Sequence, residues 1–325
     1  MRILVTGAAG FIGSALCEQL MLSSNEVTAV DNFSDYYDVS LKRLRVKELL
    51  SPLSLEVLDL DICDQSKVEK IIASSNPEVV IHLAAQAGVR LGVSESRKYV
   101  ESNLVGFSNV LISTIENKIP KFLYASSSSV YGDKAEIPYS ESESNLHPSS
   151  FYGSTKLANE LLVPTLVKNS ETVARGLRFF TVYGPYGRPD MSILRFIHWI
   201  INREEVQVFG NGEQRRSFTY VDDVISALVK VMNHNSSGTF NIGSNNTVSL
   251  NRVIEIIEDS TDVKSIVVNK ERAIKDPDVV KPDLSHIKQT LDWEPTTLID
   301  KGVQKTVEWY LENIELLKSL NYINK

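Results

Sequence analysis

Short apolar runs alternate along the first half of the chain with longer segments whose apolar positions recur every three or four residues. The short runs predict β-strands and the longer segments predict amphipathic helices. The predicted strands are Arg2–Thr6, Glu26–Val30, Leu55–Leu60, Glu78–His82, Lys121–Ala125 and Val173–Phe179. The predicted helices are Ser14–Leu22, Asp64–Ala73, Glu95–Glu116 and one that contains Tyr152. Strands alternating with helices predict an α/β fold, a Rossmann-type doubly wound parallel sheet.

The second half of the chain has fewer and more widely spaced elements. We expect a helix over Met191–Arg203, a strand over Glu205–Phe209 and a helix over Val224–Asn233. An amphipathic helix over Leu298–Leu317 closes the chain, with Trp309 in its apolar face. We therefore predict two domains, residues 1–180 around the parallel sheet and a smaller α/β substrate domain over 181–325.

A glycine turn joins the first predicted strand to the first helix. Gly7 permits a tight turn, Gly10 lets the backbone approach a pyrophosphate, and Gly13 lets the helix pack on the strand. Asp31 follows the second strand, where a carboxylate accepts hydrogen bonds from a ribose and repels a 2′-phosphate. These features predict a site for NAD rather than NADP.

Tyr152 and Lys156 stand four residues apart, so on a helix they share one face. A nearby ammonium favours the phenolate and lowers the pKa of a tyrosine. This pair is therefore a candidate for a catalytic base. The pattern also occurs by chance in many helices, so its surroundings decide its meaning.

Composition and charge argue against nucleic acid and membranes as binding partners. The 325 residues carry a net charge of −7, which argues against general binding to nucleic acid. No apolar run approaches the ~20 residues of a membrane span, and only two cysteines are present. We expect a cytoplasmic protein without a membrane segment and without a metal.

Five motifs in this order resemble those of the extended short-chain dehydrogenases/reductases that act on nucleotide sugars. They are the glycine turn, Asp61-Ile62, the segment His82 to Ala85, the serine run before Val130-Tyr-Gly132, and the pair Tyr152 and Lys156. Further stretches resemble UDP-glucuronate 4-epimerases: 31–38, 86–90, 125–132, 176–185 and 187–191.

The resemblance implies roles for individual residues. Tyr152, Lys156 and Ser127 would be catalytic. The residues that would hold NAD are Gly7, Gly10, Phe11, Ile12, Gly13, Asp31, Asn32, Asp61, Ile62, Leu83, Ala84, Ala85, Gln86, Asn103, Tyr152 and Lys156. The residues that would hold the UDP-sugar are Arg90, Ser127, Ser128, Ser129, Thr181, Arg188, Val208, Phe209, Arg216, Lys275 and Asp278.

Four positions distinguish this chain from many of its relatives. Dehydratases carry an Asp-Glu pair where Ser128 and Ser129 stand here, which argues against dehydration. Sister epimerases and decarboxylases usually have Asn at the position of Thr181. Many relatives have Arg at the position of Lys275, and a lysine lacks the bidentate fork of a guanidinium.

The implied reaction inverts C4 of UDP-glucuronate to give UDP-galacturonate through a 4-keto intermediate. Tyr152 would take the O4 proton while NAD accepts the C4 hydride. UDP-glucose or UDP-N-acetylglucosamine 4-epimerase and UDP-glucuronate decarboxylase remain alternatives. A non-catalytic NAD sensor is disfavoured because Tyr152 and Lys156 are both present.

Three structural expectations accompany the resemblance. Part of residues 217–243 should return to the first domain's sheet. Relatives dimerise through the two helices near 95–116 and 150–169, and Pro164 should kink or shorten the second. His82, at the end of a strand, is expected to be packed or hydrogen-bonded rather than catalytic.

Overall fold

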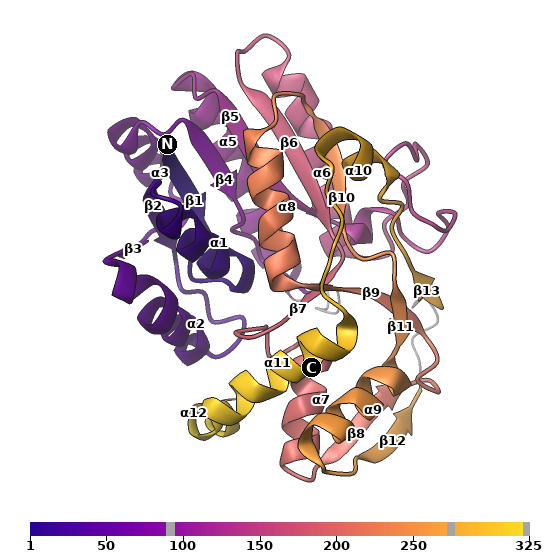
Figure 1. Cartoon of the computed structure of the whole chain (residues 1–325). Helices are drawn as coiled ribbons and strands as arrows, with labels where there is room; N and C mark the ends of the chain where they lie inside the picture. The colour runs from indigo at the N-terminus through magenta and orange to yellow at the C-terminus, as the bar shows by residue number, and fades with distance from the viewer. Residues whose placement is uncertain (89–94, 272–276, 321–325) are drawn as a thin grey trace.

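The computed structural model describes residues 1–88, 95–271 and 277–320, and seven of the described strands form one sheet (Figure 1). The strand order is β10-β6-β5-β4-β1-β2-β3. The strands are β1 Arg2–Thr6, β2 Glu26–Asp31, β3 Val57–Asp59, β4 Val79–His82, β5 Lys121–Ser127, β6 Val173–Phe179 and β10 Gly238–Ile242. Each neighbouring pair is parallel. The predicted Rossmann-type parallel sheet is confirmed.

The strand order reverses at β1, so that the strands that follow it lie on both of its sides. From β1 it runs outward through β2 to β3, whereas β4, β5 and β6 lie on the other side of β1. In such sheets ligands bind in the crevice at the carboxyl ends of the strands where the order reverses. Every residue of β4 is buried, as expected for a strand covered on both faces.

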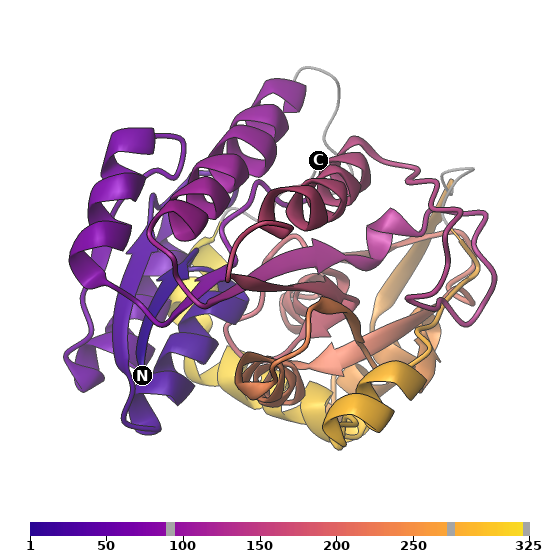
Figure 2. The same cartoon turned by 90° about the horizontal axis from the view of Figure 1, so that it is seen from above.

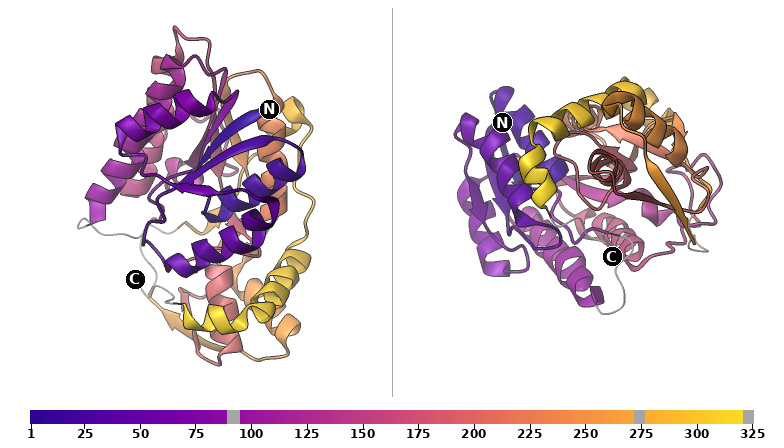
Figure 3. Two further views of the ribbon diagram at one scale, coloured as in Figure 1. Left: turned by 90° about the vertical axis from the view of Figure 1, so that its left-hand side faces the viewer. Right: turned by 90° about the horizontal axis from the view of Figure 1, so that it is seen from below.

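Helices cover both faces of the sheet (Figures 2 and 3). One face carries α3 (Gln65–Ser75), α5 (Phe107–Glu116) and α6 (Phe151–Val167), and the other carries α1 (Phe11–Leu22) and α8 (Val221–Asn233). Because α8 and β10 both belong to the parallel-sheet layer, that layer draws on residues well beyond 180. The domain boundary at residue 180 stays a prediction.

Most of the later elements form a smaller α/β unit below the large sheet in Figure 1. Its strands are β7 Thr181–Tyr183, β8 Glu205–Phe209, β9 Arg215–Tyr220, β11 Thr247–Ser249, β12 Ile266–Lys270 and β13 Val279–Val280. Its helices are α7 Ser192–Ile201, α9 Leu250–Thr261, α11 Ile299–Glu312 and α12 Ile314–Ser319. Helix α10 (Ser285–Leu291) instead packs beside β10 of the large sheet. The expected closing helix is thus two helices separated at Asn313, and Trp309 is buried in the first as expected.

Two helical segments differ from the sequence-based expectation. The expected helix 95–116 consists of α4 (Ser96–Tyr99), a π-helical stretch (Val100–Gly106) and α5. A helix that we did not predict, α2 (Val39–Arg45), begins where the Asp38 carboxylate accepts a hydrogen bond from Ser40 N–H at 2.9 Å. It continues as a π-helical turn over Val46–Leu50.

Among the residues with described positions, no helix combines the length and the apolar character needed to cross a bilayer.

Candidate active site

A cavity of about 1380 Å³ opens at the carboxyl ends of the central strands and extends to the smaller α/β unit. Its walls come from the ends of β1, β2, β4 and β5 on one side and from β7, α7, β8 and β9 on the other. The cavity therefore lies at the position that the strand order predicts, between the sheet and the smaller unit.

The glycine turn forms one end of the cavity. Gly7 has φ +74°, and a Cβ there would lie 2.7 Å from Ala84 N. A Cβ on Gly13 would lie 2.1 Å from Gly7 O, so α1 packs on the turn only with glycine at this position. The helix α1 begins after Gly10, which has no side chain to cap it, and its first N–H groups lie beside the cavity.

Asp31 lies at the end of β2 and is almost fully buried. Its carboxylate accepts hydrogen bonds from Ala9 N–H (3.1 Å) and Phe33 N–H (2.8 Å). Lys42, from the unpredicted helix α2, forms a buried ion pair with it at 3.3 Å and also donates to Ser34 Oγ. The predicted carboxylate is in place, and a lysine that we did not predict lies directly beside it.

Asn32 and Asp61 line the same end of the cavity and contact each other. Asn32 Nδ2 donates to Asp61 Oδ2 at 3.1 Å, and Cys63 N–H donates to Asp61 Oδ1 at 2.8 Å. Burial alone would raise the pKa of Asp61, but these hydrogen bonds bring it below its ordinary value. The carboxylate is therefore ionised at neutral pH.

Asn103 differs from its expected position. Its side chain accepts from Gln86 N–H (2.8 Å) and donates to Gln86 O (3.1 Å) and Thr155 Oγ1 (3.0 Å). It is 1% exposed and lies behind the residues that line the cavity. Its amide is used to tie the strand-end segment that contains Gln86 to α6, so the structure does not place it as a cofactor contact.

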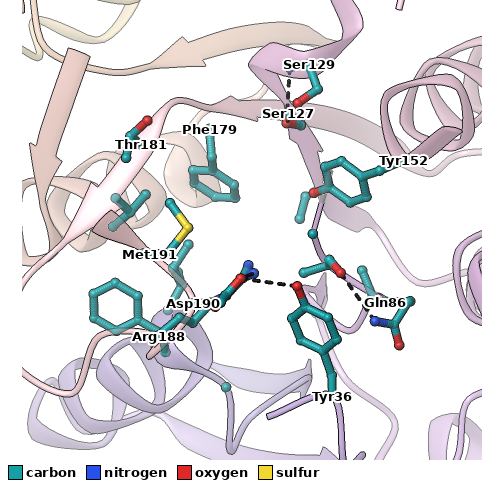
Figure 4. A pocket seen from close by; sticks show the side chains of 18 of the residues that line it. Tyr36, Gln86, Ser127, Ser129, Tyr152, Phe179, Thr181, Arg188, Asp190 and Met191 are labelled. Atoms are coloured by element: carbon teal, nitrogen blue, oxygen red, sulfur yellow. Dashed lines mark hydrogen bonds and ion pairs between the residues drawn. The ribbon is translucent and has the colours of Figure 1, made fainter. Parts of the chain in front are cut away.

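Tyr152 and Lys156 both line the cavity from the first turns of α6. The helix begins at Ser150, whose Oγ accepts a hydrogen bond from Gly153 N–H at 3.0 Å. Lys156 Nζ donates to Ala125 O at 2.9 Å and lies 5.8 Å from the centre of the Tyr152 ring. Ser127 ends β5, and Figure 4 shows it near Tyr152.

Burial has the largest effect on the pKa values of Tyr152 and Lys156. Burial raises the pKa of Tyr152 above its ordinary value, although the charge of Arg188 and the Ser127 hydroxyl act to lower it. Burial also lowers the pKa of Lys156 to about 8, partly opposed by Glu160. Arg188 therefore joins Lys156 as a positive charge near Tyr152, and its charge acts to lower the pKa of Tyr152.

A buried ion pair, not predicted from the sequence, holds α6 against the sheet. Arg178 Nε and Nη2 donate to the two oxygens of Glu160 at 3.0 and 2.7 Å. Ser126 Oγ donates to the same carboxylate at 2.5 Å. Because Glu160 is one turn beyond Lys156, this contact fixes the face of α6 that carries the pair Tyr152 and Lys156.

Small hydroxyl side chains and Arg188 line the cavity beyond Tyr152. Ser128 and Ser129 follow β5, and Thr181 begins β7. Arg188 lies across the cavity from Tyr152 and forms a bidentate ion pair with Asp190 (Figure 4). All four residues were expected to hold the UDP-sugar, and all four line the cavity.

The expected nucleotide contacts are only partly at the cavity. Phe209 and Arg216 line it. Val208 points into the core with 0% exposure, and Asp278 lies outside the lining, with its carbonyl accepting from Arg215 N–H at 2.7 Å. Arg90 and Lys275 lie outside the described residues.

His82 is packed as expected. Its Nδ1 is 2.8 Å from Thr6 Oγ1, and its ring stacks on Phe122. Burial lowers its pKa to about 3, so the imidazole is neutral.

The fold and the site agree with a known family. The model of the "NAD dependent epimerase/dehydratase family" matches residues 3–243 of this chain. The chain belongs to that family. Within it, a curated relative is the UDP-glucuronate 4-epimerase of Thermodesulfobacterium geofontis, 38% identical over 320 residues, covering 98% of this chain and 98% of the relative.

Solved structures of this family are similar over nearly the whole chain. The UDP-glucuronic acid 4-epimerase of Bacillus cereus, in complex with UDP-glucuronic acid and NAD, has a TM-score of 0.88 at 32% identity, covering 96% of this chain and 100% of that one. The UDP-glucose 4-epimerase of Thermotoga maritima, with UDP-glucose, has a TM-score of 0.89 at 30% identity, covering 97% and 100%. Because the two scores are nearly equal, overall shape does not separate the substrates and the side chains of the site must.

Proposed function

We propose that this protein inverts C4 of UDP-glucuronate to give UDP-galacturonate, through a 4-keto intermediate and with NAD as its cofactor. One observation carries the proposal: a half-buried tyrosine shares a single cavity with an arginine and three hydroxyl side chains. The base suits oxidation of a carbinol, and the arginine with its hydroxyl neighbours suits a carboxylate next to it. The relative and the solved structure named for UDP-glucuronate epimerisation support the same substrate.

The residues at the sheet end of the cavity fit NAD. The glycine turn has no room for a Cβ at Gly7 or Gly13, and its closeness to the start of α1 suits a pyrophosphate. Asp31 suits a ribose diol. NAD in this position supplies a two-electron acceptor for C4 that is regenerated in each cycle.

The chain's own groups handle the O4 proton. Tyr152 as phenolate accepts the proton of the C4 hydroxyl, and Ser127 holds O4 while it becomes a carbonyl oxygen. Lys156 keeps its ammonium beside the ring through its hydrogen bond to Ala125 O. When the sugar has turned its other face, Tyr152 returns the proton to O4.

The carboxylate contacts protect the intermediate. A 4-keto uronic acid is a β-keto acid, and it loses CO₂ when the bond to the carboxylate stands perpendicular to the carbonyl plane. Ser128, Ser129, Thr181 and Arg188 would hold the carboxylate out of that alignment. Thr181→Ala should then release more CO₂ and UDP-pentose relative to epimer, and an unchanged ratio would count against this role.

The nucleotide would lie towards the smaller α/β unit. Phe209 offers an aromatic face near uracil, and Arg216 offers a guanidinium for the UDP pyrophosphate. Since Val208 and Asp278 lie outside the lining, their expected contacts are not carried forward.

Proton NMR of the products tests the function. The purified protein is given UDP-glucuronate, UDP-glucose and UDP-N-acetylglucosamine in separate reactions. We expect inversion at C4 of UDP-glucuronate, and inversion of only the neutral sugars would overturn the substrate. Formation of UDP-pentose as the main product would instead identify a decarboxylase.

We also propose a homodimer formed by α5 and α6. These helices, with the π-helical stretch before α5, lie side by side on one face of the sheet. They expose large apolar side chains: Val105 from the π-helical stretch, Ile112 from α5, and Phe151, Leu161, Leu162 and Leu166 from α6. Helix α6 continues three residues beyond Pro164, to Val167, so the proline occupies its last turn and leaves most of the helix face available. The cytoplasmic location stays a prediction from the sequence.

A further inference from the structure

Two segments far apart in the sequence meet at the wall of the cavity. The Tyr36 hydroxyl, from the segment after β2, donates to Asp190 Oδ2 at 3.2 Å. Arg188 Nε and Nη2 donate to Asp190 Oδ1 and Oδ2 at 3.0 and 2.5 Å. Figure 4 shows the three side chains in a row, with the Arg188–Asp190 pair across the cavity from Tyr152. All three line the cavity.

The backbone beneath this row is anchored by a fully buried arginine of α2. Arg45 donates to Ala9 O (3.2 Å) in the glycine turn and to Tyr186 O (2.9 Å) and Gly187 O (3.1 Å) just before Arg188. The loop that carries Arg188 is thus tied to the turn at the sheet end of the cavity. Its position is set by the fold rather than by a ligand.

Asp190 remains charged in this environment. Burial alone would raise the pKa of its carboxyl group, but the Arg188 charge and the hydrogen bonds from Arg188 and Tyr36 hold it below its ordinary value. The Asp190 carboxylate therefore neutralises Arg188 and occupies one edge of the guanidinium. A guanidinium carries more N–H donors than one bidentate contact uses, so another edge can still meet an anion.

This arrangement determines which of two anions the Arg188 guanidinium contacts. A 4-epimerase cavity for a uronic acid contains two anions that attract Arg188: the substrate carboxylate and the Tyr152 phenolate. An arginine without a fixed partner could turn to either one. Asp190, itself held by Tyr36, keeps the guanidinium at the wall opposite Tyr152.

We propose that Tyr36 and Asp190 are positioning residues that fix Arg188 against the sugar carboxylate and so suppress loss of CO₂ from the 4-keto intermediate. The proposal rests on the proposed function. It assigns a purpose to the 31–38 and 187–191 segments, which resembled UDP-glucuronate 4-epimerases in the sequence but received no joint role there.

The reaction that these residues would prevent is decarboxylation of the 4-keto intermediate. The C5–C6 bond breaks, CO₂ leaves, and the electron pair passes to C5 and the C4 carbonyl as an enolate. Water then protonates C5 to give a UDP-4-ketopentose. A UDP-4-ketopentose that left at this stage would leave NAD reduced and that enzyme outside turnover, whereas return of the hydride to C4 would give UDP-pentose.

The test compares Tyr36→Phe and Asp190→Asn with the control Tyr186→Phe. The control removes the hydrogen bond from Tyr186 Oη to Glu48 (2.8 Å), which braces the same loop without contacting the Arg188–Asp190 pair. Each variant is given UDP-glucuronate, and CO₂, UDP-4-ketopentose and UDP-galacturonate are quantified. We expect the ratio of CO₂ to epimer to rise about tenfold in the two positioning variants, a change typical of losing one oriented contact, and to stay at the wild-type value in Tyr186→Phe.

Binding provides a second readout if a variant turns over too slowly. In the Tyr152→Phe background, calorimetry compares UDP-glucuronate with UDP-xylose, which lacks the carboxylate. Tyr36→Phe should weaken the binding of UDP-glucuronate and leave the affinity for UDP-xylose unchanged.

An unchanged product ratio with unchanged binding selectivity would overturn the proposal, as would an equal rise in Tyr186→Phe. Failure of the proposed function looks different, because the wild-type protein itself would then not invert UDP-glucuronate.

Discussion

Tyr152 lies beside Ser127 and across the cavity from Arg188 (Figure 4). Burial raises its pKa, and the Arg188 charge and the Ser127 hydroxyl act to lower it. The sequence indicated Lys156 as the residue that activates it. In the structure Lys156 donates to a backbone carbonyl, while Arg188 provides the lowering charge. The residue that we propose as the partner of the substrate carboxylate thus also lowers the pKa of Tyr152.

This balance predicts a pH dependence. Arg188 stabilises the phenolate, so removing it raises the pKa of Tyr152. Because the reaction needs the deprotonated tyrosine, the rising limb of kcat against pH should move to higher pH in Arg188→Met. The profile is measured at saturating UDP-glucuronate, with the surface variant Arg252→Met as control. No movement, or movement to lower pH, would contradict the assignment.

The Asp31–Lys42 pair predicts how cofactor choice can be changed. Asp31 repels a 2′-phosphate, and Lys42 would attract one if its carboxylate partner were removed. Asp31→Ser should therefore improve the affinity for NADP relative to NAD by about tenfold, close to the ~1.4 kcal/mol of one charge contact. Calorimetric titration of both dinucleotides measures this ratio.

The double variant Asp31→Ser with Lys42→Met is the matched control for that prediction. It removes the carboxylate and the lysine together, so the gain for NADP should disappear. A gain that persists in the double variant would show that Lys42 has no part in it.

Residues with a short-range signature could be predicted from the sequence, and residues joined across the fold could not. The glycine turn and the pair Tyr152 and Lys156 have fixed local spacings that identify them. Tyr36 and Asp190 lie 154 positions apart. Each belongs to a stretch that resembles UDP-glucuronate 4-epimerases, but neither stretch indicates that the two side chains meet. Only the fold shows that they meet.

At the scale of elements, the buried strands were predictable because both faces of the sheet are covered and their apolar runs are continuous. Helix α2 was missed, and with it Lys42 and Arg45, which line or brace the site. Its buried basic side chains weaken the apolar periodicity that normally reveals a helix. The π-helical stretch at Val100–Gly106 was also missed, since a helical pattern does not distinguish α from π hydrogen bonding.

Helix α6 depends on the buried pair Glu160–Arg178 for its place on the sheet. Glu160→Ala leaves the Arg178 guanidinium buried without its carboxylate, which should lower the free energy of unfolding by about 3 to 5 kcal/mol. The exposed pair Lys288–Glu294 is the comparison, and Glu294→Ala should cost at most about 1 kcal/mol. Urea unfolding measures both variants, and equal losses would contradict this role for the buried pair.

At the scale of the whole molecule, the cavity joins two parts of the chain that the sequence analysis treated as successive domains. The parallel-sheet layer includes α8 and β10, from the second half of the chain. This agrees with the expectation that part of residues 217–243 returns to the first domain's sheet, and the boundary near residue 180 stays a prediction. Long-range strand pairing such as β6 with β10 has no local signal, and it was expected only from the family resemblance.

The apolar face of α5 and α6 predicts that the protein is a dimer in solution. Leu161 is 67% exposed on α6, and Leu161→Glu places a charge in the proposed dimer interface. Light scattering after size exclusion should show a dimer for the wild type and a monomer for this variant. Leu298 is 65% exposed outside these helices, and Leu298→Glu should remain dimeric. Dimers in both variants would exclude this interface.

The central claim is that Tyr152 and its surroundings invert C4 of UDP-glucuronate by transient oxidation at that carbon. The most direct measurement is NMR of the product formed from UDP-glucuronate that carries deuterium at C4. We predict UDP-galacturonate with the deuterium retained at C4, and no turnover in Tyr152→Phe. Absence of an inverted product, or loss of the label to water, would contradict the account.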